Sequence, residues 1–373
     1  MRSIGIILAG GDNSRMRELS NQRAVCAMPV AGSYRAIDFA LSSMTNSGIM
    51  KVAVLTQYNA RSLNEHLSSS KWWNFGRKQG GLYLFPPTVT KTINTWYRGT
   101  ADAIWQNLDW LEQCHEPYVV IASGDGIYKL DFQRVLEYHI DKRADVTVVC
   151  TDYQQSDVER FGVLDMDADG RIREFEEKPS VASSSLVSTG IYVVRRRQLI
   201  EMLKNCAKEE RADFVRDILI RYRSIKRIFG YKMEAYWSNI SSVESYYRTN
   251  MDFLRPEVRG YFFREYPYVL SRKDDNPPAR FLGGSSVKNS LVSTGCVISG
   301  TVENSVIFKN VVVEEGCVIR NAVILGDVFV GAGSQLENCV VESRATLPRG
   351  SFLKGETGIK VVTGEKGLTR YTL

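Results

Sequence analysis

The sequence predicts an α/β domain followed by a parallel β-helix, and two observations support this fold class. From residue 1 to about residue 251, short apolar β-branched runs alternate with amphipathic helical stretches, which is typical of a Rossmann-like, mostly parallel sheet. After about residue 285 the helical pattern stops and a short repeat begins. We therefore expect an α/β domain over residues 1–266, a linker containing Pro and Gly over 267–284, and a β-helix over 285–373.

The composition fits a globular protein with two or three domains. Of its 373 residues, 44% are apolar and 24% are charged. The net charge of +6 is too mild to favour nucleic acid, but it suits small anionic ligands. No apolar run reaches the roughly eighteen residues of a membrane helix, and the first strand is too short for a signal peptide. We expect a cytoplasmic protein without membrane or nucleic-acid partners, whose seven scattered cysteines are reduced and packed.

The first twenty residues combine a strand with a Gly-rich turn. Residues 4–9 are predicted to form a buried strand, and Gly-Gly-Asp-Asn-Ser-Arg follows over residues 10–15, with a helix expected from about Met16. Such a turn presents backbone N–H groups to a phosphate. It matches neither common phosphate-loop motif, so an ordinary βα loop is the alternative. Arg15 favours a phosphate site, whereas Asp12 would repel the ligand.

The remaining elements of the first domain follow from hydrophobic periodicity. Strands are expected over residues 51–56, 118–123, 145–150 and 188–194, helices over 35–44, 62–67, 100–114 and 132–142, and a hairpin with an Asp-Gly turn over 162–172. Ligands of such sheets bind at the carboxyl ends of the strands.

The last ninety residues carry a repeat of the form Asn-x-apolar-apolar. The units begin at Asn289, Asn304, Asn321 and Asn338, with spacings of 15, 17 and 17 residues. A period near 17 with short Val/Ile strands predicts a parallel β-helix of the hexapeptide type, with one coil in each period. Antiparallel meandering strands are the alternative, but four units in phase favour the β-helix.

Three charged residues stand out as candidates for chemistry. Asp125 ends an apolar strand, a usual place for a carboxylate that binds a divalent cation bridging phosphates. Glu177 and Lys178 lie in a loop where the Lys could meet a sugar phosphate, and a solvated charge cluster is the alternative.

Several motifs resemble those of bacterial glucose-1-phosphate adenylyltransferases, also called ADP-glucose pyrophosphorylases. In family order they occupy residues 8–15, 34–39, 55–58, 96–103, 124–129, 161–163, 175–179, 190–193 and 236–237. The resemblance implies a nucleotidyltransferase domain with a mostly parallel sheet, followed by a left-handed parallel β-helix. It also implies that ATP and glucose 1-phosphate form ADP-glucose and pyrophosphate for glycogen synthesis, with Mg²⁺ as cofactor.

The resemblance also implies roles for individual residues. Nucleotide-binding positions would be Leu8, Gly10, Gly11, Gly99 and Thr100. Sugar-phosphate-binding positions would be Glu177, Lys178, Ser188, Gly190 and Tyr192. Arg15 and Asp125 would be catalytic, with Asp125 as the Mg²⁺ ligand, and Arg23 and Arg35 are candidates for an anionic effector site.

Four positions depart from the family pattern. Asn13 replaces a Gly of the phosphate turn, Gly126 replaces a His, and Val25 replaces a Lys tied to activator and substrate phosphates. Asn239 replaces the Asp that is the second Mg²⁺ carboxylate of the family. Because a neutral amide is a weaker ligand for a hard dication, we expect Asp125 to hold Mg²⁺ weakly, if it does so at all.

These departures resemble the GlgD-type subunit, which accompanies a catalytic GlgC-type subunit in many Gram-positive bacteria. The leading hypothesis is a regulatory, catalytically impaired subunit that forms a heterotetramer with a GlgC-type partner and responds to sugar-phosphate or nucleotide effectors. Without the partner, a homo-oligomer is expected. The alternative is an active, even if slow, adenylyltransferase, since Arg15, Asp125 and Lys178 remain. A β-helix acyltransferase is disfavoured because the repeat contains no His.

Overall fold

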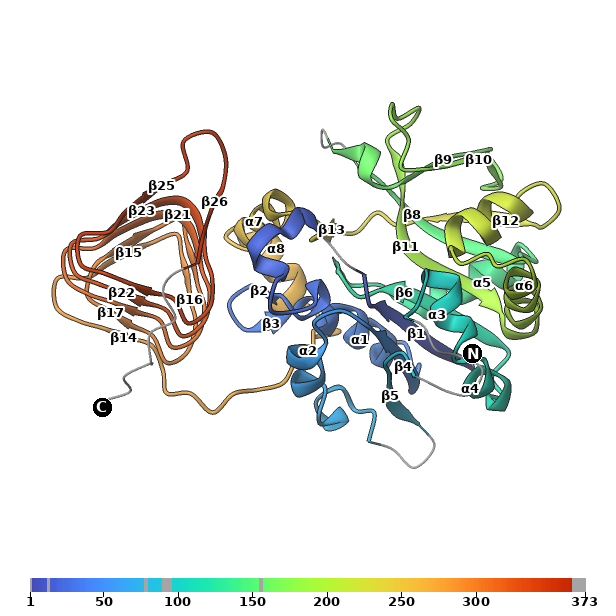
Figure 1. Cartoon of the computed structure of the whole chain (residues 1–373), viewed down its shortest axis with the longest axis horizontal. Coiled ribbons are helices and arrows are strands. Elements are labelled where there is room, and N and C mark those ends of the chain that lie inside the picture. Colours follow the sequence, from blue (N-terminus) through green and yellow to red (C-terminus); the bar gives the residue numbers. More distant parts are fainter. Residues whose placement is uncertain (1, 12–13, 77–79, 89–95, 154–156, 364–373) are drawn as a thin grey trace. The chain divides into compact units, whose positions relative to one another are not determined.

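The chain folds into two compact units. The computed structural model describes residues 2–11, 14–76, 80–88, 96–153 and 157–363 (Figure 1). Unit 1 comprises Met1–Gly11 and Phe39–Trp237, and unit 2 comprises Asp12–Asp38 and Ser238–Leu373. These units follow contacts between Cα atoms, whereas the domain boundaries predicted at residues 266 and 284 follow the sequence repeat and stay a prediction.

Unit 1 is built on a nine-stranded mixed sheet (Figure 1). The strands lie in the order β10-β9-β11-β6-β1-β4-β5, and β8 pairs with β11 and β12. Their bounds are β1 Ser3–Ala9, β4 Lys51–Thr56, β5 Gly81–Phe85, β6 Tyr118–Ser123, β8 Val146–Asp152, β9 Gly162–Met166, β10 Ile172–Glu177, β11 Leu186–Arg195 and β12 Ile228–Lys232. The central strands β6, β1, β4 and β5 are parallel, and β11 runs antiparallel to β6 and β8. The predicted α/β class is confirmed.

Helices complete unit 1 by burying their apolar faces. The α-helices are α1 Ala36–Asn46, which begins in unit 2, α2 Arg61–His66, α3 Thr100–Trp105, α4 Leu108–Gln113, α5 Phe132–Asp141 and α6 Arg196–Lys208. In α6 the buried residues Leu199, Met202, Leu203 and Cys206 recur at helical spacing, so one stripe of the helix joins the core. No helix among the described residues is both long enough and apolar enough to cross a bilayer.

Two predicted helices differ from the structure. The segment after the Gly-rich turn forms a short 3-10 helix, Ser14–Ser20, interrupted at Arg17, whose φ of 48° and ψ of −133° are incompatible with an α-helix. The helix predicted over 100–114 is divided into α3 and α4. Asn107 leaves the helical conformation with φ −109° and ψ 26°, and its side-chain amide donates to the carbonyl of Ala103 at 2.8 Å.

Unit 2 joins an N-terminal segment to the C-terminal third of the chain. The segment contains the hairpin strands β2 Pro29–Val30 and β3 Tyr34–Arg35, and the later part contains β13 Trp237–Asn239 at the unit boundary, α7 Val243–Asp252 and α8 Pro256–Arg259. Ser242 begins α7 as an N-cap, since its hydroxyl accepts from the backbone N–H of Ser245 while the Ser245 hydroxyl accepts from that of Ser242.

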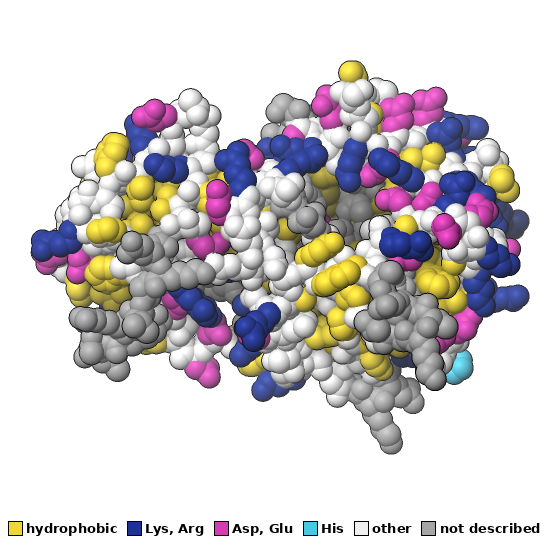
Figure 2. All heavy atoms as spheres, viewed as in Figure 1, with side chains coloured by type: hydrophobic (Ala, Val, Ile, Leu, Met, Phe, Trp, Pro, Cys, Tyr) yellow, Lys and Arg dark blue, Asp and Glu magenta, His cyan; other side chains and the backbone are white. Residues whose placement is uncertain are grey.

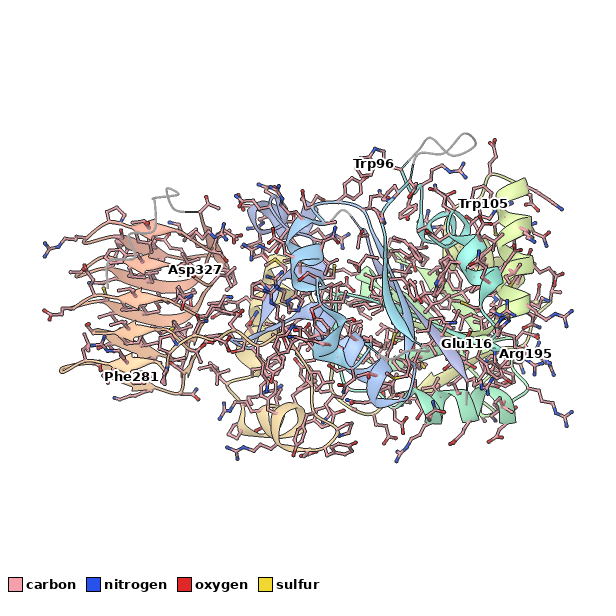
Figure 3. The ribbon with its side chains drawn as sticks, turned by 90° about the horizontal axis from the view of Figure 1, so that it is seen from below. Trp96, Trp105, Glu116, Arg195, Phe281 and Asp327 are labelled. Atoms are coloured by element: carbon pink, nitrogen blue, oxygen red, sulfur yellow. The ribbon has the colours of Figure 1, made fainter. Side chains whose placement is uncertain are left out.

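Parallel strands form the predicted β-helix, with coils of triangular outline in Figure 1 that appear as a stack in Figure 3. The first face carries β14 Arg280–Phe281, β17 Val297–Ile298, β20 Val312–Val313, β22 Phe329–Val330 and β24 Thr346–Leu347. The other faces carry β15 Ser286–Lys288, β16 Leu291–Val292, β18 Thr301–Glu303, β19 Val306–Ile307, β21 Val318–Ile324, β23 Gln335–Val341, β25 Phe352–Lys354 and β26 Lys360–Val362. Inward rows such as Val302, Ile319 and Leu336 form its core. All seven cysteines are free and buried, as predicted.

The repeated Asn residues form one corner of each coil. Asn289, Asn304, Asn321 and Asn338 have φ values from 40° to 50°, a left-handed conformation that Asn tolerates better than most residues. The first spacing is shorter because two residues separate β17 from β18, whereas four separate β20 from β21. The repeated Asn residues thus mark the positions at which the backbone turns from one face of the coil to the next.

Candidate functional site

The Gly-rich turn lies at the carboxyl ends of two adjacent parallel strands. Gly10 follows β1, and a Cβ placed on it would lie 3.0 Å from the Cβ of Gln57, which follows β4. A Cβ on Gly10 would therefore be crowded and would force Gln57 to shift, whereas a Cβ on Gly11 would meet open space. The carbonyl of Leu8 accepts from the backbone N–H of Gly124 at 3.0 Å, which ties the turn to the loop that carries Asp125.

Two exposed aromatic rings accompany this turn. Tyr58 and Trp96 stack with a centroid separation of 5.6 Å and an interplanar angle of 5°, and they are 43% and 61% exposed. Gln57 holds this region in place, because its side chain accepts from the backbone N–H of Tyr97 at 2.9 Å. Stacked, exposed rings beside a Gly turn offer a surface on which a nucleobase could stack.

Asp125 lies in the turn between β6 and β7 Gly126–Tyr128. Its Oδ1 accepts a short hydrogen bond of 2.5 Å from the hydroxyl of Ser123. A Cβ on Gly190, whose φ is +74°, would lie 3.2 Å from the Cβ of Ser123. The carboxylate loop and the irregular part of β11 are therefore in contact.

Ser188 and Gly190 occupy that irregular part, and Tyr192 follows it. The register of β11 against β8 shifts between Ser188 and Ile191, as in a β-bulge. The hydroxyls of Ser188 and Tyr192 lie 3.4 Å apart, and burial is the main reason that the pKa of Tyr192 is raised, with the charge of Glu177 adding to it. The predicted sugar-phosphate residues of β11 and β10 are thus electrostatically coupled.

Glu177 ends β10, and Lys178 follows it. The Lys178 ammonium lies 3.3 Å from Oε1 of Glu177, and the Lys178 backbone, with φ 50°, donates to the carbonyl of Phe161 at 3.2 Å. Burial raises the pKa of Glu177, and the positive charge of Lys178 opposes that rise. Only 14% of the Glu177 side chain is exposed, against 56% of that of Lys178, so the cation faces solvent.

Gly99 and Thr100 pack against a segment that the sequence analysis does not single out. The Thr100 hydroxyl accepts from the backbone N–H of Phe214 at 2.9 Å, and a Cβ on Gly99 would lie 2.5 Å from the carbonyl oxygen of Ala212. Between them lies Asp213, whose charge also acts on Glu177 and Tyr192. The predicted nucleotide-binding and sugar-phosphate-binding residues of unit 1 are therefore joined through residues 212–214.

Trp237 lies in the motif at residues 236–237, but its contacts are not predicted by the sequence. Its ring meets Tyr153 and Phe161 edge to face, at centroid distances of 5.9 and 5.2 Å. Its Nε1 is buried without a hydrogen-bond acceptor among the described residues and lies 3.7 Å from the position of a Cβ on Gly126. The Tyr128 ring lies only 3.1 Å from that same position, so the space beside Asp125 is lined by aromatic rings.

The remaining predicted residues belong to unit 2. Arg15 is exposed in the helix Ser14–Ser20. Asp12 and Asn13 lie outside the described residues. Arg23 pairs with Glu342 at 2.8 Å, and Arg35 is largely enclosed, with a pKa lowered by burial and by the charge of Arg23. The positive charges of the two candidate effector residues, Arg23 and Arg35, are therefore near enough to repel each other.

The residues present do not supply the two-carboxylate Mg²⁺ set that the resemblance implies. At the two positions that the resemblance pairs, unit 1 has the carboxylate of Asp125, which already accepts from Ser123, and unit 2 has the neutral amide of Asn239, whose oxygen is buried without a donor among the described residues. Within the described part of the chain, no three His, Cys, Asp or Glu side chains gather as metal ligands. We derive no catalytic step through a metal from this donor set.

The positive charge of the chain is concentrated in one stretch of unit 1. Residues 195–227 contain eleven Lys and Arg but five Asp and Glu, which accounts for the whole net charge of +6. Figure 2 shows Lys and Arg side chains gathered on the edge of unit 1 that carries α6. Several are already paired, for example Arg211 and Arg221 with Glu209.

Comparison with known proteins gives consistent matches along both units. The nucleotidyl transferase family model matches residues 4–255, and the model of the GlmU-like C-terminal hexapeptide matches residues 277–356. A glucose-1-phosphate adenylyltransferase of Bacillus cereus is 36% identical over 361 residues, which is 96% of each chain. Enzymes of the same name from Thermosipho melanesiensis and Fervidobacterium nodosum are 39% and 36% identical over 85% and 93% of this chain, and over 77% and 84% of their own lengths.

Proposed function

Because this chain belongs to the glucose-1-phosphate adenylyltransferase family, we propose that it is a regulatory, catalytically impaired subunit of ADP-glucose pyrophosphorylase that modulates a GlgC-type catalytic partner. The observation that carries the proposal is Asn239, an amide in place of the second carboxylate, with its oxygen buried and without a donor among the described residues. Glycogen biosynthesis and hetero-oligomer formation are parts of this proposal.

In the family reaction, a phosphate oxygen of glucose 1-phosphate attacks the α-phosphorus of ATP. The new P–O bond forms as the bond to the bridging oxygen breaks, and pyrophosphate leaves with the electron pair. Such a reaction depends on positioning and on neutralising charge, with little covalent work for the protein. An Asn at position 239 lowers the negative charge available to hold the cation that shields the reacting phosphates.

The sugar-phosphate half of the constellation supports retained ligand binding. Lys178 offers an exposed ammonium to the phosphate of the sugar, and the Glu177 carboxylate beside it can accept hydrogen bonds from sugar hydroxyls. The Nε1–H of Trp237, which is buried without an acceptor among the described residues, is a donor available to the same ligand. We infer that glucose 1-phosphate still binds, even where turnover is lost.

A second candidate function is an active adenylyltransferase, which the intact Asp125, Glu177 and Lys178 positions favour. The purified chain is assayed for ADP-glucose formation alone and after mixing with a GlgC-type catalytic subunit. Our proposal predicts little turnover alone and a changed rate or effector response of the mixture. Turnover alone at the rate of the catalytic subunit would exclude the regulatory proposal in favour of the second candidate.

The variant Asn239→Asp sharpens this choice. Restoring the carboxylate should raise ADP-glucose formation by the isolated chain at least tenfold if the lost metal ligand limits the reaction. Asn239→Ser, which restores no charge, is the matched control and should give no gain. If Asn239→Asp also gives none, the defect lies at another departure, and Asn13→Gly is then added to the same variant.

A further inference from the structure

Arg23 and Glu342 form an enclosed ion pair within unit 2. The Nη2 of Arg23 lies 2.8 Å from Oε1 of Glu342, and the side chains are only 14% and 6% exposed. The two residues are 319 positions apart, so the pair joins the N-terminal segment of the unit to the turn after β23. Enclosed guanidinium groups require a negative partner, because an unpaired buried charge is strongly unfavourable.

The carboxylate of Glu342 meets this requirement only in part. Its Oε1 also accepts from the backbone N–H of Ser343 at 2.7 Å, whereas its Oε2 is buried without a hydrogen-bond partner among the described residues. Half of the carboxylate is therefore desolvated without compensation. A tetrahedral phosphate presents more acceptor oxygens to a guanidinium and could replace this half-satisfied group.

The surroundings of Arg23 are rich in positive charge. Arg35 lies close enough for the charge of Arg23 to act on it, and Arg272 acts on the same group. Asp38 and Asp274 offset part of this charge, and Glu342 is the carboxylate in direct contact with Arg23. Glu342 thus stands where an anionic ligand of this cluster would place its charge.

We propose that Glu342 is a built-in competitor at Arg23: its carboxylate holds the guanidinium that a phosphate group would otherwise bind, so an anion binds there only by displacing Glu342. The inference deepens the proposed regulatory function and rests on it for the effector role of Arg23.

Displacement would have a mechanical consequence in unit 2. The N-terminal segment is also held by the Tyr246 hydroxyl, which donates to the carbonyl of Pro29 at 2.6 Å, and by the Asn250 side chain, which accepts from the backbone N–H of Ala31 at 3.1 Å. These contacts lie on α7, whereas the Arg23 pair reaches the β-helix. An anion that takes Arg23 from Glu342 therefore frees the segment from one coil while α7 still holds it.

The test measures binding of inorganic phosphate to the full chain by isothermal titration calorimetry. Glu342→Gln keeps the size of the side chain and removes its charge, so phosphate should bind at least tenfold more tightly than to the unmodified chain. Glu337→Gln is the matched control, because Glu337 lies on the same strand β23 but pairs with Lys354 at 3.0 Å. Its phosphate affinity should equal that of the unmodified chain.

Two further variants keep the proposal falsifiable. Glu342→Asp retains the charge but shortens its reach by one methylene, so it should give an intermediate affinity even if the Gln variant folds poorly. In the double variant E342Q/R23Q the gain should vanish. The proposal is overturned if both single variants at position 342 bind phosphate no more tightly than the unmodified chain, or if the gain persists without Arg23. No step of this test uses turnover or a partner subunit, so its outcome is independent of the proposed function.

Discussion

The coil stack of unit 2 and the candidate site of unit 1 are assembled in opposite ways. In the stack, each inward side chain lies beside the equivalent residue of the next coil, as Val302, Ile319 and Leu336 do. In the candidate site, Asp125, Lys178 and Trp237 come from separate parts of the chain, and no residue has a repeat to replace it. A substitution in one coil therefore leaves the packing of the other coils in place. A substitution in the candidate site removes the one residue that has that role.

The largest expected effect tests the packing of the stack. Ile319→Ala removes a fully buried side chain from the coil core, and such truncations cost about 3 kcal/mol of unfolding free energy. Val318→Ala, one position away on the outward row, is the matched control and should cost less than half as much. The measurement is urea denaturation followed by circular dichroism. Equal losses would mean that the inward row does not dominate the stability of the stack.

The second prediction is that lowering the pH destabilises unit 1 and not unit 2. His139 is buried in unit 1, its Nδ1 lies 2.8 Å from the Thr147 hydroxyl, and burial lowers its pKa to about 4. In the unfolded chain the pKa of a His is near about 6.5. Between about pH 4 and pH 6.5 the unfolded chain therefore binds more protons than the folded chain, and the free energy of unfolding falls as the pH drops below about 6.5. At pH 5 the loss should be about 2 kcal/mol.

The variant His139→Phe removes this titration and serves as the control. Its unfolding free energy should change less between pH 7 and pH 5 than that of the unmodified chain. All three histidines, His66, His115 and His139, lie in unit 1, so the effect should be confined to that unit. Hydrogen exchange at the two pH values can locate it, and equal loosening of the coil stack would contradict the prediction.

A third and smaller effect concerns the ligand. Lys178→Ala removes the exposed ammonium beside Glu177 and should weaken binding of glucose 1-phosphate about tenfold, or about 1.4 kcal/mol. Lys142→Ala, a Lys paired with Asp169 at 2.7 Å, is the control that should leave affinity unchanged. Calorimetric titration gives the answer without turnover. Unchanged affinity in Lys178→Ala would remove Lys178 from the proposed site.

The smallest effect tests the corners of the coils. Asn321 has φ 48°, a conformation that β-branched residues disfavour, so Asn321→Val should cost about 1 kcal/mol. Asn321→Gly keeps access to positive φ and should be nearly neutral. The same urea experiment compares the two variants. A Gly variant as unstable as the Val variant would show that a side-chain contact of Asn321 matters more than its backbone conformation.

The local sequence pattern is sufficient to predict most strands and the coil stack. The strands β4 and β6 occupy the predicted residues because their apolar runs are buried whichever neighbour they have, and the Asn corners repeat because the backbone turns at each of them. The helix predicted after the Gly-rich turn is present only as an interrupted 3-10 helix, because the positive φ at Arg17 leaves no mark in hydrophobic periodicity.

The site is predicted less completely, since its contacts span long separations in the chain. Gly10, Gly190 and Lys178 could be found by motif, and the structure gives each a physical reason for its place. The roles of Asp213 and Trp237 could not, although Trp237 lies in one of the motifs, because they depend on partners distant in the sequence: Glu177 and Tyr192 for Asp213, and Phe161 for the indole of Trp237. The Arg23–Glu342 pair is a further case at a separation of 319 residues.

The course of the chain between the units limits how gene fusion or truncation could add or remove a unit. The polypeptide passes from one unit to the other after Gly11, after Asp38 and after Trp237, so unit 2 is made of two pieces of sequence with most of unit 1 between them. A gene fragment that ends at Trp237 would still encode residues 12–38, now without the coil and the helix α7 that they contact. The two units can therefore diverge in sequence, but neither can be gained or lost by a single cut or fusion.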